Sequence, residues 1–379
     1  MIPACIIAVA ALFLLYTLFL YPLLLHVLAE RSGRPVRRAP VTPSVSVLLV
    51  VRNGDQWLAA KLDSLLALDY PPEQIREILL VSDGSVDGTA AIAARYCARG
   101  VRLLEVPPGG KARAINDGLP LLSGELVLFT DVRQELEPSC LRRLAACMAD
   151  PEVGAVSGEL VLLQGESQEK ASVGAYWKYE FWIRSNLSRL DSIFGATGAI
   201  YLMRRALTRP LPPDALLDDM HQPLGAFFQG YRLVVEPGAI AYDHPVTLDN
   251  EFRRKVRTLA GNFQILRAYP ALLGPGNRMW LHFVSTKFAR LLLPYALLAI
   301  AAATPWLPLP WVWILAAVQV AFYGMALLDT RLPNGAGLRR LTAPIRTFTV
   351  LMAASLCASA IFVVPADHLW SSGAGGTDK

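Results

Sequence analysis

Hydrophobic residues in this chain gather in long runs that carry no Lys, Arg, Asp or Glu. These runs cover residues 2–29, 291–328 and 347–366. A helix over the first run would be about 42 Å long, which exceeds the bilayer's hydrocarbon core of about 30 Å. A cleaved signal peptide has a basic start and a shorter apolar core. The pattern therefore predicts a retained N-terminal transmembrane helix over residues 1–30.

The second run is too long for a single crossing and is interrupted by prolines. Because proline removes a helix donor and clashes with the preceding turn, the segment around Pro305, Pro308 and Pro310 predicts a break. We expect a transmembrane hairpin whose helices cover residues 281–303 and 311–328. The tryptophans expected to anchor it at headgroup level are Trp306, Trp311 and Trp313.

The third run is just long enough to span and predicts a C-terminal transmembrane helix over residues 347–366. A buried helix in a soluble core is the alternative. Near the start of the hairpin, Lys287 and Arg290 are expected to extend toward the membrane interface.

Arginine placement indicates the direction of these spans. One group follows the first span and another lies before the last: Arg31, Arg34, Arg37 and Arg38, then Arg331, Arg339, Arg340 and Arg346. Both groups fall on one side if all four segments cross, and the positive-inside rule makes that side the cytoplasm. The sequence thus predicts a multi-pass protein of the cell inner membrane, with a basic linker at 31–44 and a large cytoplasmic middle region.

The middle region alternates apolar strands with helical stretches. Strands are expected at 45–51, 78–81, 101–106 and 126–130, and helices at 56–68 and 111–119. This alternation predicts parallel βαβ units. Ligands of such sheets bind beyond the carboxyl ends of the strands. The polar residues at those ends are Arg52, Asn53, Asp83 and Asp131.

Composition narrows the class of protein. Of the 379 residues, 54% are hydrophobic and 18% charged, against about 25% charged in soluble domains; a purely soluble enzyme and a disordered chain are excluded. The five cysteines show no metal-ligand spacing and are expected to be free thiols. A net charge of +5 suits an anionic membrane surface. Nothing indicates nucleic-acid binding or a heptad seam, so the oligomeric state stays open.

Five short motifs, in order, resemble the blocks of family 2 glycosyltransferases. They are Val47–Asn53, Ser82–Thr89, Gly110–Asn116, Phe129–Arg133 and Leu217–Asp219. The resemblance implies an α/β GT-A domain with a Rossmann-like mixed sheet, over residues 45–248, flanked by the transmembrane helices. It implies an inverting transferase that moves a sugar from a nucleotide-sugar, most simply a UDP-sugar, to a lipid-linked or polysaccharide acceptor at the cytoplasmic membrane face.

The resemblance also suggests roles for particular residues. Arg52, Asn53, Asp83 and Lys111 stand in its nucleotide-binding positions, although a solvated surface lysine is the alternative for Lys111. Asp87 binds nucleotide or caps the next helix.

Asp131 stands in the DxD block and implies a bound Mg²⁺ or Mn²⁺. Arg133 replaces the second acid of that block; it points away or itself neutralises phosphate charge. His221 and His244 are possible further ligands, though a structural role is commoner for a lone histidine.

The acidic pair Asp218 and Asp219 stands in the catalytic position, with Asp219 as the general base. A solvated helix start is the plain alternative. Thr197 and Gly198 lie in a small-residue loop that resembles an acceptor pocket.

Residues 249–280 predict interfacial amphipathic helices. Within them, Arg254 and Arg257 stand where processive synthases of the family carry a gating motif. Two further interpretations of the whole chain stay open: a processive synthase coupled to translocation, and a catalytically silent scaffold.

Overall fold

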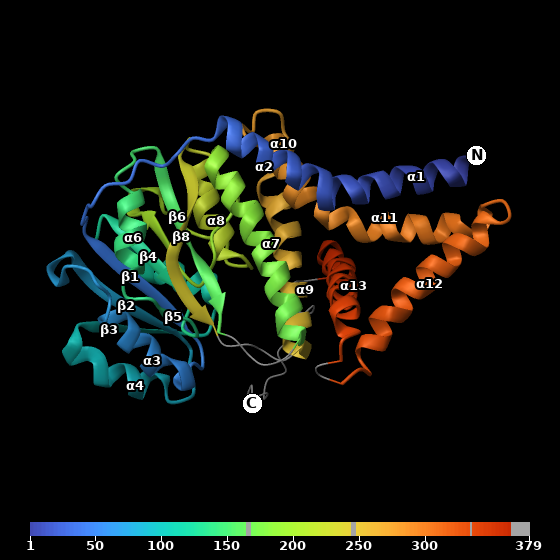
Figure 1. The fold of residues 1–379 in the computed structure, drawn as a ribbon. Helices are drawn as coiled ribbons and strands as arrows, with labels where there is room; N and C mark the ends of the chain where they lie inside the picture. Colours follow the sequence, from blue (N-terminus) through green and yellow to red (C-terminus); the bar gives the residue numbers. More distant parts are fainter. Residues whose placement is uncertain (164–167, 244–247, 334–335, 365–379) are drawn as a thin grey trace. The chain divides into compact units, whose positions relative to one another are not determined.

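The computed structural model describes residues 1–163, 168–243, 248–333 and 336–364 (Figure 1). The chain divides into two compact units. The sheet unit comprises Ala29–Leu163 and Arg184–His244; the helical unit comprises Met1–Leu28, Gln164–Ile183 and Pro245–Lys379.

The sheet unit is built on a mixed sheet of eight strands in the order β3-β2-β1-β4-β7-β6-β8-β5. The strands are β1 Val45–Val51, β2 Ile75–Asp83, β3 Val101–Val106, β4 Leu126–Thr130, β5 Glu135–Leu136, β6 Val153–Leu162, β7 Tyr201–Arg204 and β8 Arg232–Asp243. The α-helices of this unit are α3 Asp55–Leu66, α4 Thr89–Tyr96, α5 Lys111–Gly118, α6 Cys140–Cys147 and α8 Asp218–Phe227.

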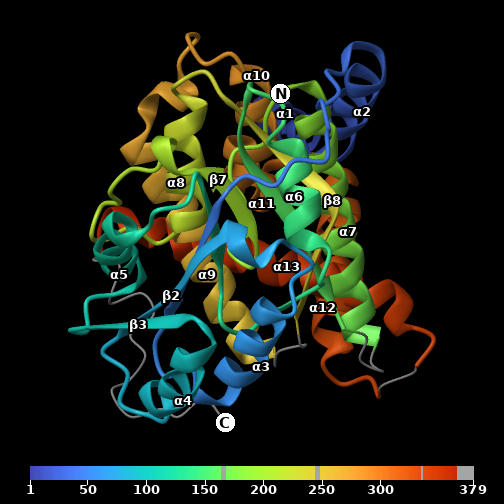
Figure 2. The ribbon, with the colours of Figure 1, turned by 90° about the vertical axis from the view of Figure 1, so that its left-hand side faces the viewer.

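The first half of the sheet is parallel, as the alternation of strands and helices predicts. β1 pairs in parallel with both β2 and β4, and β2 pairs in parallel with β3. Right-handed crossovers then place α3 and α4 on one face and α5 on the other (Figure 2). The core between these layers is aliphatic, with Val47, Leu49 and Leu128 fully buried.

The second half of the sheet turns antiparallel. β7 runs antiparallel to its neighbours β4 and β6, whereas β6 and β8 are parallel. The predicted α/β architecture with a mixed sheet is therefore present.

The helical unit contains long apolar helices. α1 Ile2–Leu15 continues through a π-helical turn, Tyr16–Leu20, into α2 Tyr21–Ser32. The remaining helices are α7 Gln168–Leu190, α9 Leu248–Ala268, α10 Trp280–Phe283, α11 Ala289–Ala303, α12 Trp311–Asp329 and α13 Arg339–Ser359. The residue bounds of the two units place the last turns of α2 and α7 in the sheet unit.

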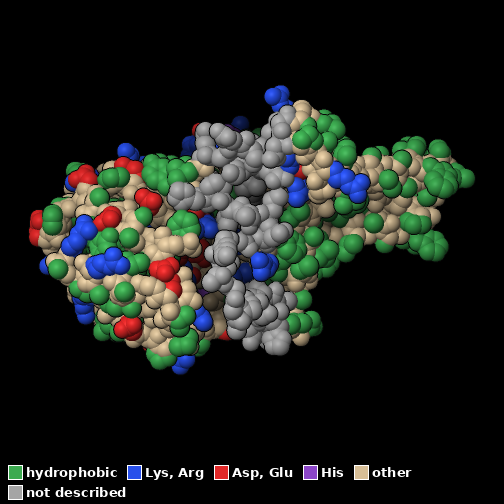
Figure 3. Space-filling model, turned by 90° about the horizontal axis from the view of Figure 1, so that it is seen from below, with side chains coloured by type: hydrophobic (Ala, Val, Ile, Leu, Met, Phe, Trp, Pro, Cys, Tyr) green, Lys and Arg blue, Asp and Glu red, His purple; other side chains and the backbone are tan. Residues whose placement is uncertain are grey.

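Within the described residues, four helical segments are long and apolar enough to cross a membrane. They are Ile2–Ser32, Trp280–Trp306, Trp311–Asp329 and Arg339–Phe362. The last begins earlier than predicted, and residues 365–366 lie outside the described residues. Figure 3 shows hydrophobic side chains on the surface of the helical unit, where Trp306, Trp311 and Trp313 are all exposed.

Two cations near the start of the hairpin have a carboxylate partner. Arg290 forms an ion pair with Glu180 of α7, and the Lys287 ammonium lies 3.9 Å from the same carboxylate. Their extension toward the membrane interface stays a prediction.

Candidate active site

The polar ends of the parallel strands meet at one edge of the sheet, together with the start of two helices. Asp83 ends β2, Asp131 follows β4, Lys111 opens α5, and Asp218 and Asp219 open α8. Segments that are far apart in sequence thus contribute to one group of charged side chains.

Lys111 links two carboxylates of this group. Its ammonium nitrogen lies 2.7 Å from Asp131 Oδ1 and 3.0 Å from Asp218 Oδ2. Burial alone would lower the pKa of Lys111, but the charges of Asp131 and Asp218 outweigh burial and raise the pKa above its ordinary value. Lys111 therefore stays charged, and the solvated surface lysine is not what the structure shows.

Asp219 is held by the small-residue loop before β7. Its Oδ2 accepts a hydrogen bond from the Gly198 N–H at 3.1 Å, and its backbone carbonyl accepts one from Ala196 at 2.7 Å. Burial, reinforced by the neighbouring Asp218, raises the pKa of Asp219 to about 6 although Lys111 opposes the shift. A carboxylate with this pKa is ionised at neutral pH and basic enough to accept a proton.

Asp83 is buried and holds the loop that leads into α5. Its carboxylate accepts hydrogen bonds from the N–H groups of Gly109 (2.7 Å) and Gly110 (3.0 Å). A guanidinium nitrogen of Arg52, a half-exposed side chain, lies 3.9 Å from the same carboxylate. Asp83 thereby positions Lys111 through the backbone; its binding to a nucleobase stays a prediction.

The loop after β1 is tied to the loop after β2. Asn53 adopts a left-handed conformation (φ 49°), donates its N–H to Ser85 Oγ and accepts the N–H of Val86 on its side chain at 2.9 Å. Asp87 accepts the N–H groups of Thr89 and Asp55, each at 3.0 Å. Asp87 therefore caps the starts of α4 and α3, the structural alternative proposed from sequence.

Arg133 turns away from Asp131. It forms an ion pair with Asp243 at 2.5 Å, and the Gln134 amide donates to the same fully buried carboxylate. The position of the second DxD acid is thus used for a structural ion pair between the loop after β4 and the end of β8.

The residues present fit a divalent cation only when phosphates share it. The described part of the chain contains no group of three His, Cys, Asp or Glu residues arranged to hold a metal. Asp131 supplies one partly exposed carboxylate, and Mg²⁺ is commonly bound by one or two carboxylates plus substrate phosphates. His221 is buried in α8, and His244 lies outside the described residues.

Lys61 beneath this site was not identified from sequence. It is fully buried, and its ammonium donates to Thr130 Oγ1 and to the Gln134 carbonyl, both at 2.6 Å. These two partners flank Asp131, so Lys61 fixes the loop that presents it. Burial lowers the pKa of Lys61 to about 7.

A signal for Lys61 exists in the sequence. The buried leucines of α3 are Leu58, Leu62 and Leu65. Lys61 lies on the same helix face as these leucines, where the helical spacing predicts an apolar residue. A lysine at such a position indicates a buried charge with a structural or functional role.

Hydrogen bonds with neighbouring side chains hold the loop that carries Thr197 and Gly198. Ser157 Oγ accepts the Thr197 N–H at 3.0 Å and a guanidinium N–H of Arg184 at 2.8 Å, and Arg184 also donates to the Gly195 carbonyl. Tyr201, at the end of this loop, is fully buried and stacks on Phe129 at 4.6 Å. The loop is therefore a rigid element facing the acidic pair.

Gly198 leaves little room for a side chain. A Cβ at this position would lie 3.0 Å from Asp131 Oδ2 and 3.6 Å from Asp219 Oδ2. We expect Gly198→Ala to lower kcat/KM by about tenfold, because the added methyl group would push the Asp131 carboxylate out of position and a misplaced group in an active site is costly.

Gly225→Ala on α8 is the matched control, since its Cβ would make only an ordinary contact with Arg209 at 3.6 Å. Kinetics of the two variants beside wild type would check this prediction, and equal activity of all three would contradict it.

Arg254 and Arg257 lie on α9 in the helical unit. Their gating role stays a prediction, as do the assigned roles of the other site residues.

The chain is similar in sequence to known proteins. The model of glycosyl transferase family 2 matches residues 46–211. An N-acetylglucosaminyltransferase of Rhizobium meliloti is 28% identical over 73% of this chain and 70% of its own length. The poly-beta-1,6-N-acetyl-D-glucosamine synthase of Staphylococcus epidermidis is 24% identical over 59% of this chain and 55% of its own length.

A solved structure shares the fold. The mannosyltransferase of Pyrobaculum calidifontis, determined with GDP-Man and Mn²⁺, superposes with a TM-score of 0.73 at 24% identity, covering 97% of this chain and 99% of that one. Residues 46–211 thus carry a domain that matches glycosyl transferase family 2, and the chain is a glycosyltransferase with the GT-A fold.

Proposed function

We propose that this chain is an inverting, membrane-anchored transferase that moves N-acetylglucosamine from UDP-GlcNAc to a lipid-linked or glycan acceptor at the cytoplasmic membrane face. One observation carries the proposal: at the carboxyl edge of the parallel strands, Lys111 forms ion pairs with Asp131 and with Asp218 of the Asp218–Asp219 pair. The sugar follows from the names of the N-acetylglucosaminyltransferase relatives.

Asp219 is the group that accepts a proton. The acceptor hydroxyl attacks the anomeric carbon while the bond from that carbon to the diphosphate oxygen breaks, so the configuration inverts. Asp219 takes the hydroxyl proton, and the hydrogen bond from Gly198 fixes the orientation of its carboxylate. Asp218 balances Lys111 beside it.

Lys111 and Asp131 serve the leaving group. The Lys111 ammonium lies at the start of α5, where the helix dipole also favours anions. A divalent cation, when bound at Asp131, supplies further positive charge to the departing diphosphate. Arg52, Asn53 and Asp83 lie beyond the ends of β1 and β2, where a nucleoside is expected in this sheet type.

A lipid-linked acceptor lies in the membrane, and a transferase that acts on it would need the membrane-spanning helices. Four segments in the described part of the chain are suited to spanning a membrane, and the arginines near their ends favour a cytoplasmic catalytic unit. A processive synthase is the second candidate, favoured by the likeness to the poly-beta-1,6-N-acetyl-D-glucosamine synthase. Product length distinguishes the two, because a single transferase adds one residue to each acceptor.

The pKa of Asp219 sets a pH dependence. A general base must be ionised, so activity is fully present above the folded-state pKa of about 6 and is lost as the pH falls through it. We expect kcat/KM to fall about tenfold per pH unit below pH 6. A rate profile between pH 5 and 8 with circular dichroism as a control for folding would check this, and a flat profile would contradict it.

A donor panel tests the proposed reaction. The purified full chain in membrane lipid is incubated with UDP-GlcNAc, UDP-glucose or GDP-mannose, each with Mn²⁺ or EDTA, and released nucleoside diphosphate is measured. We expect UDP release from UDP-GlcNAc to exceed release from the other donors and to require acceptor lipid. Preferred use of GDP-mannose would refute the donor, and no release from any donor would refute the transferase.

A further inference from the structure

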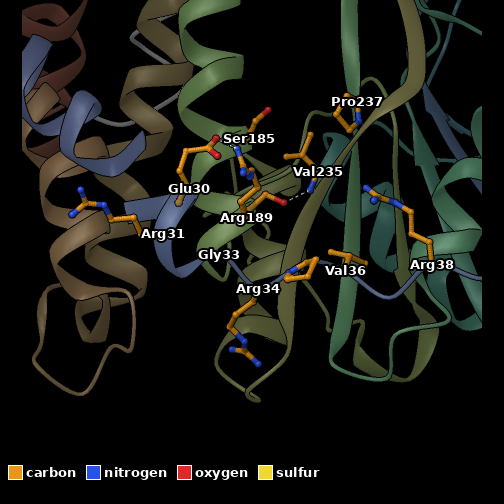
Figure 4. A pocket seen from close by; sticks show the side chains of 13 residues that line it. Glu30, Arg31, Gly33, Arg34, Val36, Arg38, Ser185, Arg189, Val235 and Pro237 are labelled. Atoms are coloured by element: carbon orange, nitrogen blue, oxygen red, sulfur yellow. Dashed lines mark hydrogen bonds and ion pairs between the residues drawn. The ribbon is translucent and has the colours of Figure 1, made fainter. Parts of the chain in front are cut away.

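A cavity of about 520 Å³ opens in the sheet unit between the start of the linker, the end of α7 and the middle of β8 (Figure 4). Three arginines of its lining, Arg34, Arg38 and Arg189, are each paired with a carboxylate. None of the lining residues belongs to the active site. The buried cation that bears on the reaction is instead Lys61 of α3, which donates to two neutral oxygens.

The hydrogen bonds of Lys61 run in one direction. Its ammonium lies 2.6 Å from Thr130 Oγ1, and Thr130 Oγ1 lies 2.6 Å from the Ala199 carbonyl oxygen. Because a carbonyl oxygen can only accept, the Thr130 hydroxyl donates its one proton to Ala199 and accepts a hydrogen bond from Lys61. The three groups therefore form a chain of hydrogen bonds, which we call the Lys61 chain.

The Lys61 chain joins two loops of the active site. At its start, the ammonium also donates to the Gln134 carbonyl at 2.6 Å, so that it holds both ends of the loop that presents Asp131. At its far end, the chain holds the loop of Gly198, and the Gly198 N–H donates to Asp219 Oδ2 at 3.1 Å. The chain thus connects the loop of the expected cation ligand with the loop that orients the expected proton acceptor.

The two loops also lie against each other. A Cβ on Gly198 would lie 3.0 Å from Asp131 Oδ2, and the strands next to the loops, β4 and β7, are paired. A small change in the separation of the loops therefore moves both the Asp131 carboxylate and the N–H group that holds Asp219. Misplacing a reacting group by about 1 Å can lower a rate by roughly 10²-fold.

Packing alone does not require a lysine at this position. Lys61 is fully buried and Thr130 is 4% exposed, and the apolar face of α3 is made by Leu58, Leu62 and Leu65. Moving an ammonium out of water is costly, and replacing a buried charged group with an apolar residue of similar volume is often neutral or stabilising. The hydrogen bonds to the two loops are therefore what the lysine adds to the fold.

We propose that Lys61 is a positioning residue of the transferase. Through Thr130 it sets the separation between the loop that presents Asp131 and the loop that carries Gly198, and it so aligns the cation ligand with the proton acceptor. Lys61 is fully buried and acts through these neighbours. The inference rests on the proposed function, which assigns those two roles, but the link between the loops is also measurable without turnover.

A double-mutant cycle in the purified full chain tests the Lys61 chain. Lys61→Met keeps the length of the side chain without its donors, and Thr130→Val keeps the shape of threonine without its hydroxyl. We expect each variant to lower kcat by about tenfold and to raise amide hydrogen exchange in residues 196–200 by about fivefold, the factor for one hydrogen bond. The double variant should lose little more than either single variant, because groups in one network are not additive. Thr130→Ser restores a hydroxyl and should recover most of the lost activity.

Thermal stability and a neighbouring hydroxyl provide the controls. The Tm of Lys61→Met should stay near that of wild type or rise, because the variant no longer buries an ammonium. Ser64→Ala on the same helix removes a hydroxyl that accepts the Leu136 N–H at 3.3 Å. That hydroxyl lies outside the Lys61 chain, so Ser64→Ala should keep the wild-type kcat and the wild-type exchange in residues 196–200.

Unchanged exchange in residues 196–200 of both single variants would overturn the proposal, and so would a double variant whose loss of kcat is the product of the two single losses. A lower Tm with faster exchange throughout the sheet unit would make Lys61 a purely structural residue. If Lys61→Met does not fold, Thr130→Val beside Thr130→Ser measures the same link. If wild type transferred no sugar, the proposed function would fail, and the exchange data would still test the link between the loops.

Discussion

Asp219→Asn is expected to lower kcat by about 10²–10⁴-fold, the range for loss of a general base, while the affinity for UDP stays close to that of wild type. The amide keeps the shape of the side chain and can still accept the Gly198 N–H, which lies 3.1 Å from Oδ2. It cannot accept a proton at neutral pH. The loss therefore falls on the chemical step rather than on nucleotide binding.

Three measurements separate this from a general loss of structure. UDP affinity by calorimetry and the Tm report on the folded site, and the acid limb of the pH profile should disappear in the variant. Asp214→Asn, an exposed acid just before α8, serves as the control and should retain activity. Near-full turnover by Asp219→Asn would show that another group accepts the proton.

Asp131→Asn is expected to produce the second large effect. It should change the binding of the nucleotide as well as the rate. In wild type we expect Mn²⁺ to tighten UDP binding, because the cation joins the diphosphate to Asp131. The variant should bind UDP equally with Mn²⁺ or EDTA and lose about 10²-fold or more in kcat/KM, since metal stabilisation of a leaving group is worth several kcal/mol.

A control variant at a nearby carboxylate shows whether the effect depends on which charge is removed. Asp117→Asn removes an exposed carboxylate from α5 and should keep the response to Mn²⁺. If Mn²⁺ tightened UDP binding equally in Asp131→Asn and Asp117→Asn, Asp131 would not be the cation ligand. Loss of the response in both would indicate a long-range electrostatic effect instead.

The parallel half of the sheet was predictable because its signals are local. β1, β3 and β4 begin and end at the residues expected from their apolar runs, and the alternation with helices dictates their pairing. The antiparallel half has no comparable local signal. β7 has only four residues, and the pairing of β6 with β8 joins segments separated by about 80 residues.

The sequence motifs identified residues of the site, but they did not show which of these residues contact one another. Lys111 and Asp131 stand 20 residues apart, and no periodicity predicts that they touch. The partner of Arg133 lies 110 residues away on β8, so only the folded chain shows that this arginine pairs with a buried carboxylate. Asp83 likewise contacts the Gly109–Gly110 loop, which makes it a positioning group first.

The most direct test of the central claim is a structure of the full chain in lipid with UDP and Mn²⁺ bound. The account predicts diphosphate density in contact with Lys111 and Asp131, the uridine beyond β1 and β2, and the Asp219 carboxylate open to a neighbouring acceptor space. A nucleotide bound away from these side chains, or Asp219 turned out of hydrogen-bond reach of that space, would contradict it.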